Sequence, residues 1–335
     1  MTGASQRVNP PHEIVNSCVR FLLPIASSDR MYLKGFNMRP HALEALRWRP
    51  EDPAIRKAIE RAVHESDENV RAAGIVALSA VEPNRAALLA TEWLNEYLDS
   101  MQVKSEVIRP ETLGFLQIVP LANRSSVETL LVRWLAFGSK TRAELAIGYL
   151  CDEPEFCSPD ISSNARLLLS DKRLIANVRL GLAVCEDRAS AEWLEQHLQD
   201  ASIRYLLLSK WQPSLSEITQ PLLTRDKILK AAQDEWQSPE QVRRLMVARF
   251  DIVTGGNRGY AVLERFVESS LSRATQNTYN AEGLTALSIL AECPHESSVG
   301  LARTLFDGNE NALVRIQAAA LILKAHHQES ARPAR

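Results

Sequence analysis

DENVRAAGIVAL, residues 67–78, combines a polar start, a Val-Arg pair and apolar residues at helical spacing. The small and branched residues that follow Arg71 recur so that one side of a helix is continuously apolar. The stretch therefore predicts a short helix that buries one face, preceded by a polar turn.

This pattern recurs along the chain at a nearly constant interval. Clear further copies are ANVRLGLA at 176–183, PEQVRRLMVA at 239–248 and NENALVRIQAAAL at 309–321. Taking one marker residue from each clear or weaker copy gives positions 39, 71, 109, 142, 179, 204, 243, 280 and 315. The marker is Arg except at Asn280, and the mean step is 34.5 residues, with one irregular step of 25 residues into Arg204.

An interval of this size fits two helices and two short turns. Two helices of roughly 12 to 15 residues with their connections occupy about 35 residues. One such hairpin cannot bury its apolar face alone, so the next hairpin must stack on it. Between the markers, apolar spacing predicts further helices over 54–64, 86–98, 127–137, 189–198 and 260–271.

Composition supports an all-helical chain. Leu contributes 44 and Ala 40 of the 335 residues, whereas Gly contributes only 13. Good helix formers in this proportion argue strongly against an all-β fold. The formal net charge is −2, which argues against a chain whose main task is to coat nucleic acid.

Cysteine usage and hydropathy predict a cytoplasmic protein without a membrane partner. The five cysteines, at 18, 151, 157, 185 and 293, are odd in number and irregularly spaced, so no disulfide framework is predicted. Cys185 in particular lies among apolar neighbours, which is typical of a small buried side chain. No apolar run approaches the ~20 residues of a membrane span, and the polar first residues do not match a secretory leader.

The repeat resembles the HEAT class of α-solenoids, with the armadillo class close by. The resemblance covers most of residues 35–326 and is most specific near Arg71, Arg179, Arg243 and Arg315. It implies an all-α, right-handed α-solenoid of about eight to nine stacked helical hairpins. Tetratricopeptide repeats have a similar length, but their Trp-Leu-Gly-Tyr and Ala-Phe-Pro markers do not recur here.

The expected organisation follows from this reading. Residues 1–9 and 329–335 are predicted to be disordered ends, 10–34 an N-terminal capping helix, and 35–328 the HEAT-like solenoid. Prolines predict a long loop over 151–163. A second proline-containing loop near 212–224 is a possible soft division of the array.

The recurring arginines have two interpretations. They form a functional ladder on the concave face, or they hold neighbouring repeats in register; the second is favoured. The resemblance implies a bond from each arginine to an acidic or amide side chain of the adjacent repeat, with Asp67, Asn177 and Asn311 as candidate partners. The predicted structural markers are Arg39, Arg71, Arg109, Arg142, Arg179 and Arg315.

One segment is rich enough in arginine to suggest binding. Six arginines lie between 243 and 273, interrupted by acidic residues at 251, 264 and 268. The binding candidates are Arg243, Arg244, Arg249 and Arg258, as a ridge for phosphate or an acidic partner. Because positive and negative side chains are interspersed in this segment, an ordinary solvent-exposed helix face is favoured over a binding ridge. Arg47-Trp48-Arg49 similarly suggests either a nucleic-acid contact or a core tryptophan with solvated neighbours.

No motif predicts a cofactor, a metal site or a catalytic residue. The glycine-rich stretch 254–259, TGGNRG, lacks the Lys-Ser/Thr of a phosphate-binding loop and is predicted to be a turn between two helices. No histidine pair has the spacing of a zinc-binding helix, and no Cys-x-x-Cys pair occurs. Enzymatic activity is therefore disfavoured, although the sequence leaves it open.

These observations favour a non-enzymatic scaffold or adaptor that binds another protein along the concave face formed by the second helices of the hairpins. Two alternatives remain. One is a nucleic-acid-binding protein similar to HEAT-like DNA glycosylases, which would use the arginine-rich ridge. The other is a subunit similar to HEAT-like chromophore lyases, which would need a reactive pocket and for which Cys151 and Cys185 are the only candidate thiols.

Overall fold

The computed structural model describes residues 10–28, 32–33, 36–100, 124–136, 140–211, 218–219, 222–271 and 280–331. Within these ranges the regular secondary structure is helical except for one antiparallel pair of two-residue strands, β1 (Tyr32–Leu33) and β2 (Phe36–Asn37). The all-α prediction is therefore confirmed. Among the described helices, none combines the length and apolar character that a bilayer crossing requires.

The chain divides into two compact units. Unit 1 comprises residues 1–93, 110–122 and 260–335, and unit 2 comprises residues 94–109 and 123–259. The boundaries fall within α5 (Pro83–Ser100) and α16 (Arg258–Leu271) rather than in the predicted loop near 212–224. That loop lies partly outside the described residues.

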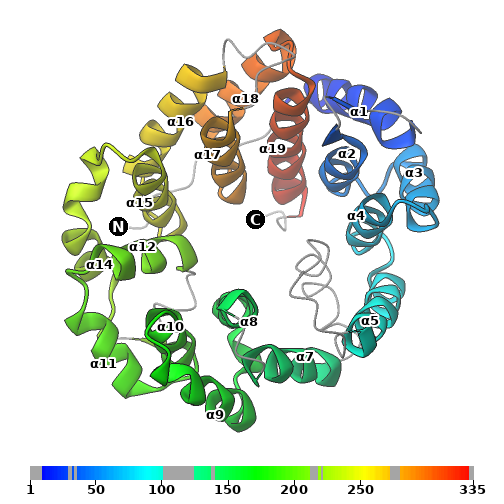
Figure 1. Cartoon of the computed structure of the whole chain (residues 1–335). Helices are drawn as coiled ribbons and strands as arrows, with labels where there is room; N and C mark the ends of the chain where they lie inside the picture. Colours follow the sequence, from blue (N-terminus) through cyan, green and yellow to red (C-terminus); the bar gives the residue numbers. More distant parts are fainter. Residues whose placement is uncertain are drawn as a thin grey trace. The chain divides into compact units, whose positions relative to one another are not determined.

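Unit 1 contains two layers of helices (Figure 1). One layer is the row α17 (Ala281–Glu292), α19 (Ala312–Ser330), α2 (Arg39–Leu46) and α4 (Glu68–Leu78), each packed on the next. The other layer includes α18 (Glu296–Gly308), α1 (His12–Ser27) and α3 (Pro53–Val63), which pack on α19, α2 and α4 respectively. Helices adjacent in sequence thus form hairpins, and the hairpins pack side by side.

The first and last helices of the chain pack against each other in unit 1 (Figure 1). Helix α1 contacts both α3 and α19, and α2 lies between α4 and α19. The expectation of a capping helix over 10–34 therefore differs from the structure. A cap keeps one side open to solvent, whereas the apolar residues of α1 are covered by the C-terminal helices on that side.

Unit 2 repeats the two-layer arrangement. Its row of second helices is α8 (Lys140–Asp152), α10 (Ile175–Val184), α12 (Ala201–Lys210) and α15 (Gln241–Val253). Behind them pack α7 (Arg124–Ala136), α9 (Pro159–Leu167), α11 (Arg188–Gln196) and α14 (Arg225–Ala231). The segments η2 (Pro154–Phe156), η3 (Leu168–Ser170) and η4 (Gln233–Gln237) are short 3-10 turns between them.

Helix starts follow local rules. Asp and Asn side chains at the N-cap accept hydrogen bonds from free backbone N–H groups of the first turn. They do so at Asp52, Asp67, Asp187, Asp200, Asn280 and Asn311. The helices predicted over 54–64, 86–98, 127–137, 189–198 and 260–271 are confirmed as α3, α5, α7, α11 and α16, to within a few residues at each end.

Two segments differ from the predicted loops and ends. The expected loop over 151–163 is wrong, because η2 and the start of α9 occupy most of it. Ser158 caps α9 by accepting a hydrogen bond from the Ile161 N–H, and Pro159 is compatible with the first helical turn. The start of the expected C-terminal tail at 329 is also wrong, since α19 continues to Ser330. The predicted disordered ends over 1–9 and 332–335 lie outside the described residues.

Candidate protein-binding groove

The candidate site is a groove of about 800 Å³ over the second helices α8, α10 and α12 of unit 2. We call it the α8–α12 groove. The helices contribute successive exposed positions, because residues spaced by three or four lie on one helix face. From α12 these include Ser202, Tyr205, Leu206 and Ser209, and from α8 Thr141, Glu144 and Leu145. The turn before α10, the first turn of α10 and the end of α11 complete the lining.

Aromatic side chains form part of the groove lining. Near the end of α11, the rings of Trp193 and His197 stack with centroids 4.0 Å apart and an interplanar angle of 20°. His197 Nδ1 lies 2.7 Å from the Trp193 carbonyl oxygen, which fixes the histidine ring against the helix end. Tyr205 on α12 remains 41% exposed. Large rigid rings of this kind are typical anchors of protein interfaces.

The carboxylates that line the groove already have internal partners. Asp200 accepts a 2.7 Å hydrogen bond from the Ser202 N–H, and this bond lowers the pKa of the Asp200 carboxyl below its usual range. The Asn177 side-chain amide donates to Glu144 at 3.5 Å. Arg173 is neutralised by Asp171, with an Nη2–Oδ2 distance of 2.7 Å.

Two lysines in the groove are not paired. Lys172, before α10, and Lys210, at the end of α12, are exposed and form no ion pair within the described residues. Lys210 lies along α8, where a side chain at Gly148 would place its Cβ 3.3 Å from the Lys210 Nζ. The donors to Asp200 and Glu144 are neutral, so the groove presents both carboxylate and ammonium groups beside its aromatic surface.

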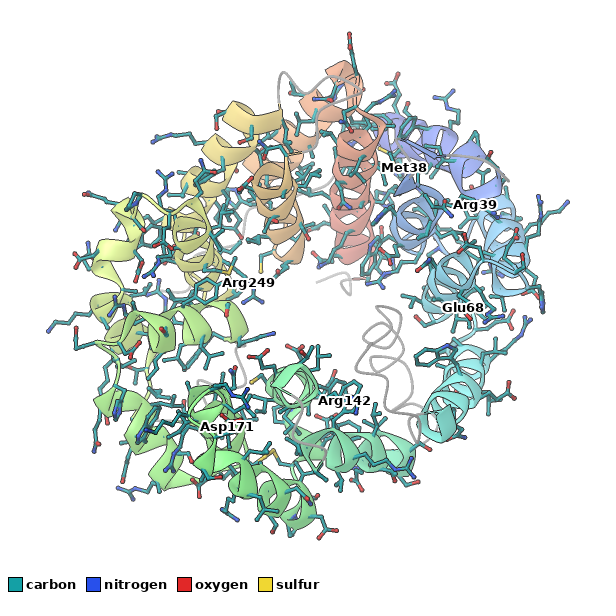
Figure 2. The ribbon with its side chains drawn as sticks, viewed as in Figure 1. Met38, Arg39, Glu68, Arg142, Asp171 and Arg249 are labelled. Atoms are coloured by element: carbon teal, nitrogen blue, oxygen red, sulfur yellow. A yellow bond between two sulfur atoms is a disulfide. The ribbon has the colours of Figure 1, made fainter. Side chains whose placement is uncertain are left out.

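The predicted binding arginines are engaged within unit 2. Arg243 contacts Glu240 (Nε–Oε2, 2.8 Å) and Glu235 (Nη1–Oε1, 3.4 Å). Arg249, labelled in Figure 2, is only 9% exposed and donates to the carbonyl oxygens at the end of α12. Those carbonyls belong to Ser209 and Trp211, at 3.2 and 3.3 Å.

The other two candidates are also placed on or near α15. The Arg258 guanidinium carbon lies 4.1 Å from the Trp236 ring centroid, and Arg244 is half-buried on α15. None of the four lines the α8–α12 groove. Ligand binding by these arginines stays a prediction.

The marker arginines, apart from Arg109, lie within the first five residues of the second helices. Arg39 pairs with Glu65 across 2.7 Å, and Arg142 is buried on α8; both are labelled in Figure 2. Arg179 donates to Ser190 Oγ at 3.2 Å, and Arg315 donates to the Phe306 carbonyl at 2.9 Å. Arg71 is half-buried on α4, whereas Arg109 lies outside the described residues.

Arg39 has the expected kind of partner, an acidic side chain near the start of the next second helix, but the side chains of Asp67 and Asn177 bond other groups. Asp67 and Asn311 cap α4 and α19, and Asn177 donates to Glu144. At a helix start the cap side chain accepts hydrogen bonds from the free backbone N–H groups, so it is not available as an acceptor for the arginine. The bond between neighbouring elements is instead made by residues such as Glu65 and Glu235, which the repeat pattern did not single out.

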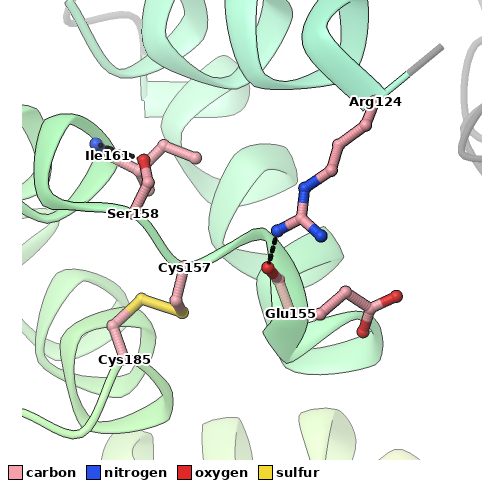
Figure 3. The surroundings of a disulfide bond; sticks show 6 residues. All are labelled: Arg124, Glu155, Cys157, Ser158, Ile161 and Cys185. Atoms are coloured by element: carbon pink, nitrogen blue, oxygen red, sulfur yellow. Dashed lines mark hydrogen bonds between the residues drawn. A yellow bond between two sulfur atoms is a disulfide. The ribbon is translucent and has the colours of Figure 1, made fainter.

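A further expectation, that the cysteines form no disulfide, is wrong. Cys157, between η2 and α9, forms a disulfide with Cys185 at the end of α10, although no disulfide was predicted (Figure 3). The two cysteines are separated by 28 positions, and the chain between them folds back so that their side chains meet, which irregular spacing in the sequence does not reveal. Figure 3 also shows Arg124 donating to the Glu155 carbonyl, which fastens η2 to the start of α7.

The two candidate thiols of the chromophore-lyase alternative, Cys151 and Cys185, are poor nucleophiles. Cys151 is fully buried on α8, and burial raises the pKa of its thiol to about 12. A thiol that is buried and protonated at neutral pH does not react readily. Cys185, in the disulfide, has no thiol to offer. Within the described residues, no group of His, Cys, Asp and Glu side chains is arranged to hold a metal ion.

The glycine-rich stretch 254–259 is the predicted turn between two helices, α15 and α16. Gly255 adopts a φ of +84°, which favours glycine. The Gly259 N–H donates to Asp251 Oδ2 at 2.9 Å, and Arg225 pairs with the other oxygen of that carboxylate at 2.7 Å. The buried Asp251 carboxylate thus occupies the position that an anion would take.

Trp48 joins α2 to α19 in unit 1. The Arg47 guanidinium carbon lies 4.5 Å from its ring centroid, and the Lys324 Nζ lies 5.5 Å from it. Burial lowers the pKa of both cations. The half-buried indole therefore already contacts cations of this chain. A nucleic-acid contact at this tryptophan stays a prediction.

Sequence reasoning missed the groove residues Trp193, Tyr205 and Lys210. Their signal is present, since 202, 205, 206 and 209 share one face of α12, but only the packing shows that this face is uncovered. A comparison with known proteins finds no family model that matches the chain and no curated protein that matches it significantly.

Proposed function

We propose that this protein is a non-enzymatic scaffold or adaptor that binds a segment of another protein in the α8–α12 groove. The observation that carries the proposal is the groove itself, which runs over three neighbouring second helices and exposes Tyr205 beside the stacked Trp193. Grooves between helices with rigid aromatic anchors are common sites of peptide recognition.

The proposal includes a fold assignment. Helical hairpins of recurring length, with a marker residue near the start of the second helix, support a right-handed HEAT-like α-solenoid of about eight to nine hairpins. In such arrays the second helices line a concave face that recognises partners, and the α8–α12 groove lies on these helices. The arginine-rich ridge of the nucleic-acid alternative has less support, because Arg243, Arg249 and Arg258 make internal contacts.

A cytoplasmic location remains part of the proposal, although the disulfide between Cys157 and Cys185 is evidence against a reducing compartment. Disulfides persist mainly in oxidising compartments. Blocking free thiols during cell lysis and then counting the labelled cysteines by mass spectrometry decides the question. Labelling of Cys157 and Cys185 supports a reducing cytoplasm, and a protected pair argues for an oxidising compartment.

The test places a photo-crosslinking amino acid at position 205 in the full-length protein expressed in its native cells. Leu167, on α9 of the same unit and 74% exposed, is the matched control position. We expect a protein partner that crosslinks at position 205, does not crosslink at position 167, and survives nuclease treatment. Double substitution of Tyr205→Ala and Lys210→Ala should abolish capture without lowering the melting temperature. Crosslinks lost on nuclease treatment, or none at position 205, contradict the proposal.

A further inference from the structure

The contact between α1 and α19 in unit 1 contains a pair of histidines, His12 on α1 and His326 on α19. We propose that this contact is a pH-sensitive switch, which holds α1 on α19 while both rings are neutral and releases α1 when His326 binds a proton. The switch belongs to unit 1, so it adds a regulatory device to the protein without depending on the α8–α12 groove of unit 2.

The two histidine rings meet edge to face. Their centroids lie 5.2 Å apart with an interplanar angle of 69°, an arrangement that neutral aromatic rings favour. His326 is only 9% exposed, so a proton on its ring is largely shielded from water. His12 is exposed and can take up a proton from solvent. Two protonated rings at this distance repel each other across the contact between α1 and α19.

The charged groups around His326 supply little compensation for its proton. These groups are His12 from α1, Arg49 and Glu51 from the turn after α2, and His327 from α19 itself. The Glu51 carboxylate is paired with the Arg49 guanidinium, so its negative charge is already balanced by a cation of this chain. A proton on His326 therefore introduces a positive charge for which these groups hold no further counter-charge.

Two other helices, α17 and α18, pack on α19. The Glu292 carboxylate at the end of α17 lies near Lys324, and Asp307 of α18 lies near Cys18 of α1. Burial is the largest of the causes that lower the pKa of His326. The ring is therefore neutral at neutral pH and gains its proton in mildly acidic solution.

The direction of the effect follows from proton linkage. When α1 is released, His326 is exposed to water and has the ordinary histidine pKa of about 6.5. The docked state binds the proton more weakly, so acidification favours release. For one proton, the ratio of released to docked α1 rises by at most about tenfold per pH unit below that value. Above it, this group has no effect on the ratio.

Helix α1 can open while the row of second helices stays intact. It packs on this row from the outer layer, whereas α19 lies within the row between α17 and α2. Local opening of this kind costs least where an element has few neighbours. The second half of α1 is fastened through Phe21, which contacts Phe306 and Arg315 and involves no histidine. Release therefore begins at the His12 end and uncovers the buried residue Ile14.

The experiment measures amide hydrogen exchange of the full-length protein at about pH 7.5 and about pH 5.5, corrected for intrinsic exchange rates. In the wild-type protein, protection of α1 should fall several-fold at the lower pH, and at most about tenfold. Protection of α4, in the same unit, should not change. His326→Gln should remove the loss in α1. His64→Gln is the matched control and should retain the loss, because His64 is an exposed histidine of α3 beside Glu60.

Three outcomes overturn the proposal. They are a loss of protection that is equal in α1 and α4, no loss in α1, and a loss of unchanged size in His326→Gln. If His326→Gln itself loosens α1 at the higher pH, His12→Gln decides, because it removes the repulsion between the rings at an exposed position. A smaller loss in His12→Gln supports the switch, and an unchanged loss overturns it. None of these results bears on the α8–α12 groove, whose test is crosslinking at position 205.

Discussion

At the scale of single residues, much of the electrostatic organisation depends on buried acids that join neighbouring elements. Glu235 in η4 is 5% exposed and receives Arg204 of α12 at 3.0 Å and Arg243 of α15 at 3.4 Å. One carboxylate thereby compensates two cations from two second helices. The regular arginines are visible in the sequence, but the acids that pair with them follow no period.

Replacement of Glu235 by Ala is therefore expected to destabilise unit 2. Removing one member of a buried ion pair leaves uncompensated charge, and the cost is about 3 kcal/mol of unfolding free energy. Urea denaturation measures it. Replacement of Glu240, an exposed partner of Arg243, is the control and should cost under about 1 kcal/mol. Equal losses at the two positions would contradict a special role for Glu235.

His326 predicts a pH dependence of stability in unit 1. It lies on α19, and burial, together with Arg49, His12 and His327, lowers its pKa; Glu51 acts in the opposite direction. The folded protein therefore holds fewer protons at this site than the unfolded chain. Above the pKa of histidine in the unfolded chain, about 6.5, protonation of His326 does not affect stability. As the pH falls from about 6.5 to the lower pKa of His326 in the folded protein, the free energy of unfolding decreases.

The measurement compares urea midpoints at neutral and mildly acidic pH. The wild-type protein should lose more stability on acidification than the His326→Gln variant, which has no proton to bind. A variant with an unchanged pH dependence would show that other groups control acid sensitivity.

At the scale of elements, close helix packing is set by individual glycines. Gly74 on α4 faces α3 so closely that an added Cβ would lie 2.9 Å from backbone atoms of Ala62 and Val63. Gly300 on α18 has nothing within 4 Å of the same position. The same substitution should therefore have opposite effects in the two hairpins.

Gly300→Ala is expected to stabilise the protein by about 0.5 to 1 kcal/mol, because alanine restricts the unfolded chain and favours helix. Gly74→Ala should destabilise it by about 1 to 3 kcal/mol through overpacking. Thermal denaturation of both variants shows whether each substitution raises or lowers the melting temperature. A stabilised Gly74→Ala protein would mean that α3 and α4 move apart without cost.

The disulfide should stabilise the η2–α9–α10 segment. Closing a loop with a sequence separation of 28 residues contributes roughly 3 to 4 kcal/mol on the chain-entropy model. Calorimetry with and without reductant should show a lower melting temperature for the reduced wild-type protein. The Cys157→Ser variant should melt at the lower temperature under both conditions. An unchanged melting temperature on reduction would show that the bond is not formed in the sample.

At the scale of the whole molecule, the two ends of the chain are parts of one unit. Phe21 of α1 packs edge-to-face on Phe306 of α18, with ring centroids 5.5 Å apart. The Arg315 guanidinium carbon of α19 lies 4.1 Å from the Phe21 ring centroid. An ordinary repeat array has two independent ends, which fray separately. In unit 1 we therefore expect the stability of α1 to depend on α18 and α19.

Hydrogen exchange tests this coupling. Phe306→Ala should cost about 3 to 5 kcal/mol and should speed amide exchange in α1, far away in sequence. Ile161→Ala removes a comparably buried side chain in unit 2 and is the control, which should leave α1 protected. If exchange in α1 is the same in both variants, the terminal helices are not energetically coupled.

The sequence by itself determined the helical elements, their starts and their recurrence. Apolar spacing, cap residues and prolines act within a few positions of one another, so α3, α4 and α19 can be read directly from the chain. Only the tertiary structure decided the contacts between distant positions. It paired Cys157 with Cys185, placed α1 on α19, gave Arg204 and Arg243 a shared acid, and exposed one face of α12 with Lys210 unpaired. These outcomes depend on which surfaces meet after folding, and a local pattern does not contain that information.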